Sequence, residues 1–265
     1  MKQLDYNIHT HTFRCGHARG TDEEYVLAAI KNGFKVVGFS DHMMVKGRPQ
    51  NGIRGDYSLI DNYISCINAL KEKYKDQITI LLGMECEYFP KMHDYYEFLL
   101  KEKGLDFLIL GQHCYINSDD QYEWYFDNRD PYEAIDLYVE DMIKGMQLGL
   151  FSYVCHPDYF VRHLTAFDDK AVEITRRICE AAKKYDIPLE INLNGIRGWY
   201  LKYSGFHYPY PDFWGIVSEY GVKVTIGVDA HNPGDFDIAD HEYAMELVNQ
   251  YHLNLVTNYK DLLKK

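Results

Sequence analysis

Short apolar runs alternate with longer amphipathic runs along the whole chain, and this alternation restricts the possible folds more than any other feature. Strands are predicted at residues 4–9, 35–39, 78–84, 107–110, 151–155, 189–192 and 222–228. Helical periodicity is seen between them, for example at residues 21–33, 130–149 and 168–186. The first of these helices is expected to begin at an N-cap, Thr21, and to end at Gly33. Repeated strand–helix units imply parallel strands with right-handed crossovers, so we expect an α/β fold, either an open sheet or a barrel.

The chain has 265 residues, enough for one large domain or two small ones. It contains no interior linker and no shift in composition, so we expect a single domain over residues 1–265. Two predicted connections, residues 43–56 and 193–210, are longer than ordinary connectors. Long loops in a compact domain are more often binding loops or lids than idle connectors, although a surface insertion is the alternative.

Composition excludes several classes of function. A formal charge of −12 argues against a nucleic-acid binder, because no cationic track is present. The sequence has no apolar run of about 18 residues and no apolar segment typical of a signal peptide near its start, so no membrane association is expected. Its six cysteines are scattered without a C-x-x-C pair, which favours a reduced, cytoplasmic protein. The expected partner is a small molecule, and the oligomeric state is left open.

Polar residues that can bind metals or catalyse reactions follow every predicted strand. In chain order they are His9, His11, His17, Asp41, His42, Glu85, His113, His156, Arg197, Asp229 and His231. Parallel strands of a barrel direct their carboxyl ends to one face, where barrel enzymes carry their active sites. We therefore expect residues spread over more than 200 positions to converge on one pocket.

A single histidine after a strand is usually an ordinary loop residue, but agreement at seven strand ends is hard to ascribe to chance. Four other histidines match no strand end and are expected to have no such role: His93, His163, His241 and His252. His207 is left undecided. Three cysteines lie beside proposed ligands, and strand alternation would direct them to the opposite face, toward packing: Cys86, Cys114 and Cys155.

Imidazole and carboxylate ligands without thiolates suit zinc, iron or manganese. Seven histidines with one glutamate and one aspartate are too many for one tetrahedral ion and fit two or three ions with a bridging carboxylate. Closely spaced divalent ions can activate a water and hold phosphoryl oxygens in line, which favours phosphoester hydrolysis. Amide hydrolysis would use similar parts.

Several motifs, in this order, resemble the polymerase-and-histidinol-phosphatase (PHP) family of metal-dependent phosphoesterases. They are "HTHTFRCGH", "SDH", "GMECE", "GQH", "CHPD" and "GVDAH", and the resemblance covers nearly the whole chain. The H-x-H-x5-H opening combined with G-x-D-x-H near the end is specific. The resemblance implies a distorted, TIM-like (β/α)7 barrel, in agreement with the seven predicted strands.

The resemblance also implies three divalent metal ions, zinc by preference, with manganese or iron as alternatives. It assigns His9, His11, Glu85 and Asp229 to the first ion. Glu85 would bridge to the second ion, completed by His113 and His156, and the third would be held by His17, His42 and His231. Glu87 is a rival for Glu85, which the G-x-E pattern favours.

Within the family, "HTHTFRCGHARGT" and "LEINLNGIR" are most similar to the stand-alone histidinol-phosphate phosphatases. That similarity implies hydrolysis of L-histidinol phosphate by a metal-bridging hydroxide, with Arg197 on the phosphate and Asp229 or His231 serving the leaving group. An arginine suits this position because its planar guanidinium can bind two phosphate oxygens. Weaker substrate candidates, chosen by location, are Arg162, His207, Tyr115, Tyr159 and the aromatic residues of 199–210. Asp41 is expected to orient a ligand histidine.

Three other interpretations stay open at this point. The first is a PHP phosphoesterase acting on a nucleotide or a phosphotyrosine protein. The second is a module that binds metals without turnover. The third is a barrel amidohydrolase, which usually depends on a metal-bridging lysine, and no lysine stands at a predicted strand end.

Overall fold

The computed structural model describes residues 4–127, 129–197, 207–236 and 238–264. Four parallel strands form its first sheet, in the order β1 (Tyr6–Asn7), β2 (Val36–Phe39), β3 (Thr79–Cys86) and β4 (Phe107–Leu110). Almost every residue of these strands is buried. Such unbroken apolar runs are typical of a parallel sheet covered on both faces.

A second parallel sheet contains β7 (Leu189–Asn192), β8 (Lys223–Gly227) and β9 (Asn254–Leu255). Val154 connects the two sheets, because it forms bridges to Leu110 and to Leu189. A bridge between Thr10 and Ala230 joins the exits of β1 and β8. The strands therefore curl into a distorted (β/α)7 barrel, as predicted, with one member reduced to a single bridging residue.

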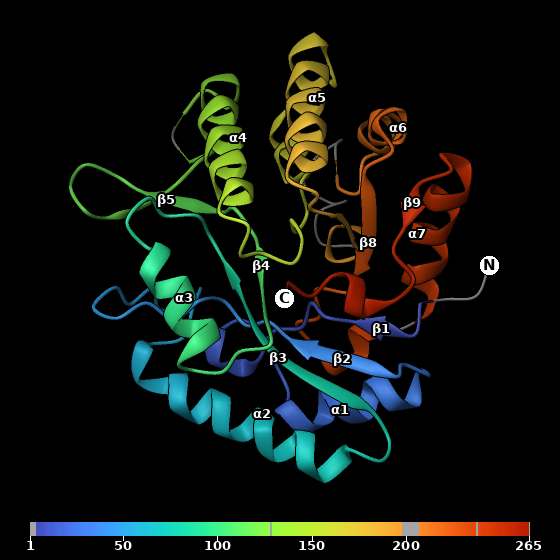
Figure 1. Cartoon of the computed structure of the whole chain (residues 1–265). Helices are drawn as coiled ribbons and strands as arrows, with labels where there is room; N and C mark the ends of the chain where they lie inside the picture. The colour runs from blue at the N-terminus through green and yellow to red at the C-terminus, as the bar shows by residue number, and fades with distance from the viewer. Residues whose placement is uncertain (1–3, 128, 198–206, 237, 265) are drawn as a thin grey trace.

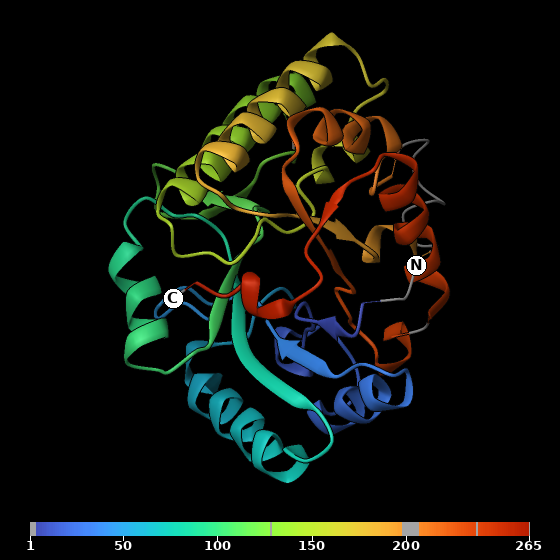
Figure 2. The same ribbon diagram turned by 45° about the vertical axis from the view of Figure 1, so that its right-hand side comes forward.

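Helices surround the strands (Figure 1). They are α1 (Asp22–Lys31), α2 (Ile60–Tyr74), α3 (His93–Lys101), α4 (Pro131–Gln147), α5 (Asp169–Lys184), α6 (Pro211–Tyr220) and α7 (Ile238–Gln250). In the view of Figure 1, α1 and α2 lie beneath β2 and β3, and Figure 2 shows α4 and α5 side by side. None of the helices in the described part of the chain has the length and hydrophobicity of a bilayer-crossing segment.

The helix starts follow from local sequence. Thr21 caps α1, because its hydroxyl accepts from the Glu24 N–H while the Glu24 carboxylate accepts from the Thr21 N–H. This reciprocal pair is a capping box. Asp130 and Asp168 cap α4 and α5 more simply, because their carboxylates accept from backbone N–H groups of the first helical turn. These caps determine the residue at which each helix begins.

The predicted strand at 151–155 is wrong as an extended pairing segment. Its backbone N–H groups donate to the segments on either side: Ser152 donates to the Leu108 carbonyl and Val154 to the Pro188 carbonyl. Only Val154, however, forms β-bridges. The chain then turns at His156, where φ is +31°, and this turn ends the pairing. The segment still occupies the place of a barrel strand.

An antiparallel hairpin that was not predicted follows β4. It consists of β5 (Cys114–Ile116) and β6 (Tyr122–Trp124). Its turn contains Asn117, whose side chain accepts from the N–H groups of Asp119 and Gln121. The hairpin begins one residue after His113, at the carboxyl end of β4, and so extends the wall of the barrel mouth.

Candidate metal centre and active site

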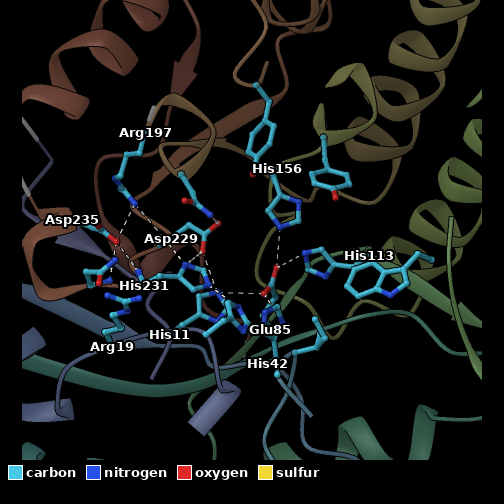
Figure 3. Close-up of a pocket in the computed structure, with 18 residues that line it drawn as sticks. His11, Arg19, His42, Glu85, His113, His156, Arg197, Asp229, His231 and Asp235 are labelled. Carbon is cyan, nitrogen blue, oxygen red and sulfur yellow. Dashed lines mark hydrogen bonds and ion pairs between the residues drawn. The ribbon is translucent and has the colours of Figure 1, made fainter. Parts of the chain in front are cut away.

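The carboxyl ends of the strands meet at a pocket of about 770 Å³. Its lining residues are His11, His17, Arg19, His42, Gly52, Ile53, Glu85, His113, Trp124, His156, Tyr159, Asn194, Arg197, Tyr208, Asp229, His231, Asn232 and Asp235. Figure 3 shows labelled histidines from separate strand ends directed at Glu85 and Asp229. His9 lies just beneath, fully buried.

Glu85, on β3, is the centre of one half of the cluster. Its Oε1 is 2.9 Å from His156 Nε2 and 3.6 Å from His113 Nε2. Its Oε2 is 3.1 Å from His42 Nδ1 and 3.5 Å from His11 Nε2. A carboxylate between four imidazoles has the geometry expected of a bridging ligand.

Asp229, just after β8, is the centre of the other half. Its Oδ1 lies 3.1 Å from His11 Nε2, 3.4 Å from His231 Nδ1 and 3.5 Å from His9 Nε2. Its backbone has a φ of +49°, in the left-handed region that non-glycine residues seldom adopt. Strain of this kind is concentrated at functional sites, and here it directs the carboxylate into the cluster.

His17 and His231 form the outer edge of the cluster. Their Nε2 atoms are 3.0 Å apart, and the His231 ring stacks on His11 with centroids 4.1 Å apart. The ring centroids of His42 and His17 are 5.4 Å apart. The three imidazoles assigned to a third ion are thus neighbours in the structure.

Burial and charge together determine the ionisation of this cluster. Burial raises the pKa of Glu85, but the neighbouring histidines, His113 first among them, together outweigh this effect, and the net pKa lies well below its usual value. Asp229 behaves alike, with His9 and His11 holding its pKa well below the ordinary range. Both carboxylates are therefore ionised at neutral pH.

Three imidazoles of the cluster, His17, His42 and His231, have a pKa below the usual value. Burial lowers the pKa of His42 well below its usual value, and the neighbouring His11 lowers it further. Burial and His11 lower the pKa of His231 to about 3. A neutral imidazole has the free lone pair that a metal needs.

The donor set fits divalent ions. Three groups bring one ligand atom from each residue within 4.8 Å of the others: His9–His11–Glu85, His42–Glu85–His113 and His11–His42–His231. Among the described residues, Glu85 Oε2, Asp229 Oδ1 and His42 Nδ1 are buried without a hydrogen-bond partner. Buried polar atoms normally have partners, so these atoms indicate sites for ligands. Nitrogen and oxygen donors of this kind suit zinc and similar ions.

Two further groups of possible ligand atoms include a cysteine: Cys15 with His11 and Asp41, and Cys155 with His9 and Glu190. Burial raises the pKa of both thiols above the usual value. A protonated thiol is a poor ligand, in line with the packing role expected for Cys155.

Glu190, on β7, was missed by the sequence analysis. It is fully buried, and its Oε1 lies 2.7 Å from His9 Nδ1 while its Oε2 accepts from the His156 backbone N–H. A carboxylate at Nδ1 orients the ring and leaves Nε2 directed at the cluster. The available signal was a charged residue between the apolar Leu189 and Ile191 of a predicted strand.

Glu87, the rival of Glu85, lies in a different environment. Both of its oxygens accept from the buried guanidinium of Arg54, and its Oε1 is also 3.2 Å from His113 Nδ1. Asp41 lies 3.6 Å from His11 Nδ1 and accepts from the Thr12 hydroxyl. Glu87 and Asp41 thus each lie near the Nδ1 atom of a single histidine, whereas the Glu85 carboxylate lies between four histidines.

Arg197 lies at the pocket wall. It donates to the backbone carbonyls of Val228 at 2.5 Å and Asp229 at 3.3 Å, and it lies 3.5 Å from the Asp235 carboxylate. These contacts hold the strained turn at Asp229. Figure 3 shows Arg197 and Asp235 on the opposite side of the cluster from His113.

The structure does not bring all proposed substrate contacts to the pocket. Tyr159 lines it, but Tyr115, Arg162 and His207 are not among its described lining residues. Tyr115 accepts from Arg129, and the Arg162 guanidinium lies 5.1 Å from the Tyr159 ring centroid. The aromatic residues at 199–206 lie outside the described residues. Five further lining residues were not predicted from the sequence: Trp124, Arg19, Asn194, Asn232 and Asp235.

A (β/α)7 barrel with a cluster of histidine and carboxylate ligands at the carboxyl ends of its strands defines a metal-dependent barrel enzyme. The model of the PHP domain family matches residues 7–194. The chain therefore belongs to the PHP family.

Curated relatives match over most of their length. A probable histidinol-phosphatase of Deinococcus radiodurans is 29% identical over 243 residues, covering 88% of this chain and 89% of the relative. A histidinol-phosphatase of Bacillus subtilis is 24% identical, covering 87% of this chain and 95% of the relative.

Solved structures share the fold. The histidinol phosphate phosphatase of Lactococcus lactis, complexed with zinc, L-histidinol and phosphate, superposes with a TM-score of 0.75 at 20% identity, covering 100% of this chain and 99% of that one. A putative histidinol phosphatase of Listeria monocytogenes gives 0.69 at 20% identity, covering 87% and 96% of the two chains. At this identity the likeness is evidence for the PHP barrel fold.

Proposed function

We propose that this protein is a metal-dependent phosphomonoesterase that hydrolyses L-histidinol phosphate to L-histidinol and phosphate. One observation carries the proposal above all others. Ligand-type side chains on or just after β1, β2, β3, β4, the segment 151–155 and β8 meet at the mouth, beside a pocket of about 770 Å³ that suits a small phosphomonoester. The names of the near full-length relatives supply the choice of substrate.

The proposed ligands would form three sets, each for one divalent ion. His9, His11, Glu85 and Asp229 would hold the first, and Glu85, His113 and His156 the second. His17, His42 and His231 would hold the third. Zinc is the expected metal, with manganese or iron as alternatives. Divalent ions in such a centre polarise phosphoryl oxygens and lower the pKa of a water toward about 7.

The two sides of the pocket differ in chemistry. Arg197 stands on one side, and its planar cation is suited to orient a phosphate; the exposed Arg19 lies on the same side (Figure 3). Trp124, Tyr159 and Tyr208 lie on the other side, near His113 and His156. We propose that these aromatic rings receive the imidazole of the substrate, with Asp229 or His231 serving the leaving oxygen.

The proposal extends to the setting of the activity. We place it in the cytoplasm, where the six cysteines would stay reduced, as they are in the structure. We also propose that residues 1–265 act as one domain, because β7 and β8 complete the barrel that β1–β4 begin. The partner is a small phosphomonoester, and neither nucleic acid nor membrane is required.

The test is the kcat/KM for L-histidinol phosphate against nucleotides, phosphotyrosine and simple phosphomonoesters, with metal-free protein reloaded separately with zinc, manganese or iron(II). A clear preference for L-histidinol phosphate is expected. His113→Ala should abolish it, and Arg197→Ala should raise KM more than it lowers kcat. Arg176→Ala, an exposed arginine of α5, is the matched control and should match the wild type. Comparable weak activity on all substrates would refute L-histidinol phosphate as the specific substrate. No turnover with any metal would refute the proposed enzymatic activity.

A further inference from the structure

Residues 43–56, between β2 and α2, contact both the pocket and the interior. Gly52 and Ile53 line the pocket, and the next residue, Arg54, turns inward with its side chain 0% exposed. A fully buried arginine needs its charge matched and its N–H groups satisfied, otherwise its burial is strongly destabilising.

Each end of the Arg54 guanidinium is held. Nη1 and Nη2 donate to the two carboxylate oxygens of Glu87 at 2.9 and 2.8 Å, a two-point pairing. Nη1 also donates to the Met43 carbonyl at 3.1 Å, and Nε donates to the Gln50 side chain at 2.7 Å. The guanidinium lies 5.1 Å from the ring centroid of Tyr122. Arg54 thereby connects Met43, at the start of the loop, and its own backbone, near the end of the loop, to Glu87.

Glu87 connects this loop to the metal cluster. Its Oε1, which accepts from Arg54, also lies 3.2 Å from His113 Nδ1. With a proton on Nδ1, the lone pair of His113 is on Nε2, which faces Glu85 at 3.6 Å. Glu87 is 1% exposed, and the pairing of both its oxygens with Arg54 holds the carboxylate in place beside His113.

We propose that Arg54 is a positioning residue that couples the pocket-facing loop 43–56 to the metal ligand His113 through Glu87. Docking of the loop fixes the carboxylate, and the carboxylate fixes the tautomer and ring orientation of His113. By linkage, metal binding at His113 stabilises the docked loop to the same degree. The inference rests on the proposed metal centre, but not on the identity of the substrate.

Three variants test it. Arg54→Lys keeps the charge but loses the two-point pairing. The double variant Arg54→Met/Glu87→Leu removes both charges, which usually preserves folding better than breaking a buried pair. Arg48→Lys is the matched control, because Arg48 is on the same loop but pairs with the exposed Asp120 outside the pocket.

The first readout is zinc retention against a competing chelator, measured on folded protein by metal analysis. Loss of an outer carboxylate typically costs about 10–100-fold in metal affinity. We expect Arg54→Lys and the double variant to lose one zinc equivalent about 10–100-fold more readily than the wild type and Arg48→Lys. If the folded double variant retains every equivalent at wild-type affinity, the pair is only structural and the proposal is overturned.

The second readout is hydrogen exchange of the amides in residues 43–56, with and without zinc. Zinc should slow this exchange in the wild type and in Arg48→Lys, but not in the double variant. An equal effect of zinc in all three would overturn the coupling. Neither readout uses a substrate, so a wild type that couples zinc to the loop without hydrolysing L-histidinol phosphate would refute the proposed function alone.

Discussion

At the scale of single residues, two glycines make room for the buried carboxylates. A Cβ on Gly111 would lie 2.0 Å from Glu85 Oε1, and a Cβ on Gly227 would lie 1.7 Å from Glu190 Oε1. Contacts this short cannot be accommodated without moving the carboxylate. The lack of a side chain at these two glycines is therefore required for the observed positions of the Glu85 and Glu190 carboxylates.

Replacement of Gly111 by alanine tests this point. The added methyl would displace the Glu85 carboxylate, so Gly111→Ala should lower kcat/KM at least about 100-fold, roughly 3 kcal/mol in transition-state stabilisation. It should also reduce zinc retention. Gly234→Ala is the control, because a Cβ there would meet open space. Wild-type kinetics in Gly111→Ala would contradict the packing argument.

Glu190 offers a second test at the same scale. Glu190→Gln keeps the shape of the side chain but removes the charge that lies 2.7 Å from His9 Nδ1. Zinc affinity should fall by about 10–100-fold while the protein stays folded. Chelator competition measures the change, and Glu180→Gln, at an exposed position of α5, should behave as wild type. Equal affinities in the two variants would show that Glu190 has no orienting role.

Single residues also show the reach and the limit of sequence reasoning. His113 and His156 were identified because each follows a predicted strand, and chain position alone reveals that. Glu190, Arg54 and Trp124 were not, because their roles depend on which neighbour each side chain meets across the barrel. That information is absent from local periodicity.

At the scale of elements, regular strands bounded by clear helical segments were predicted well and irregular segments were not. Strand β7 and strand β4 have their predicted bounds, 189–192 and 107–110. The segment 151–155 is apolar enough for a strand, but the turn at His156 limits its pairing to one residue. The hairpin β5–β6 has no clear alternation in the sequence, so only its tertiary contacts reveal it.

The N-cap of α1 can be tested by mutation. Thr21→Ala removes the hydroxyl that accepts from the Glu24 N–H, and loss of such a cap costs about 1 kcal/mol. For a chain of this size, the melting temperature should fall by about 2–4 °C. Thr21→Ser retains the acceptor and should melt close to wild type. Identical melting of the alanine and serine variants would refute a stabilising cap.

His241, on α7, should make stability depend on pH. Burial and the charge of Arg197 lower the pKa of His241 from 6.5 to about 4. Because the unfolded chain takes up the proton first, His241 costs stability as pH falls from 6.5 to about 4, by about 3 kcal/mol at most. Above pH 6.5 this cost is absent.

Urea unfolding of metal-free protein at pH 7 and pH 4.5 measures this effect. His241→Leu removes the titrating group at a position 2% exposed, so it should lose less stability than the wild type between these two pH values. Parallel losses in the two proteins would show that protonation of His241 does not contribute.

At the scale of the whole molecule, the barrel gathers ligand-type residues from distant positions in a chain whose net charge is negative. The formal charge is −12, yet the proposed substrate carries a phosphate. Arg19 and Arg197 line the pocket, and bound divalent ions would make its local potential positive. The local charge of the mouth, rather than the net charge, would then govern the binding of an anionic substrate.

The central claim is that the ligands gathered at this mouth form a trinuclear centre that hydrolyses a phosphomonoester. The most direct measurement is a zinc titration of metal-free protein while the hydrolysis of L-histidinol phosphate is followed. We expect negligible hydrolysis without metal, a rise as zinc is bound, and saturation at about three equivalents per chain, the number of ligand sets proposed above. Undiminished hydrolysis by metal-free protein, or full zinc loading without hydrolysis, would contradict it.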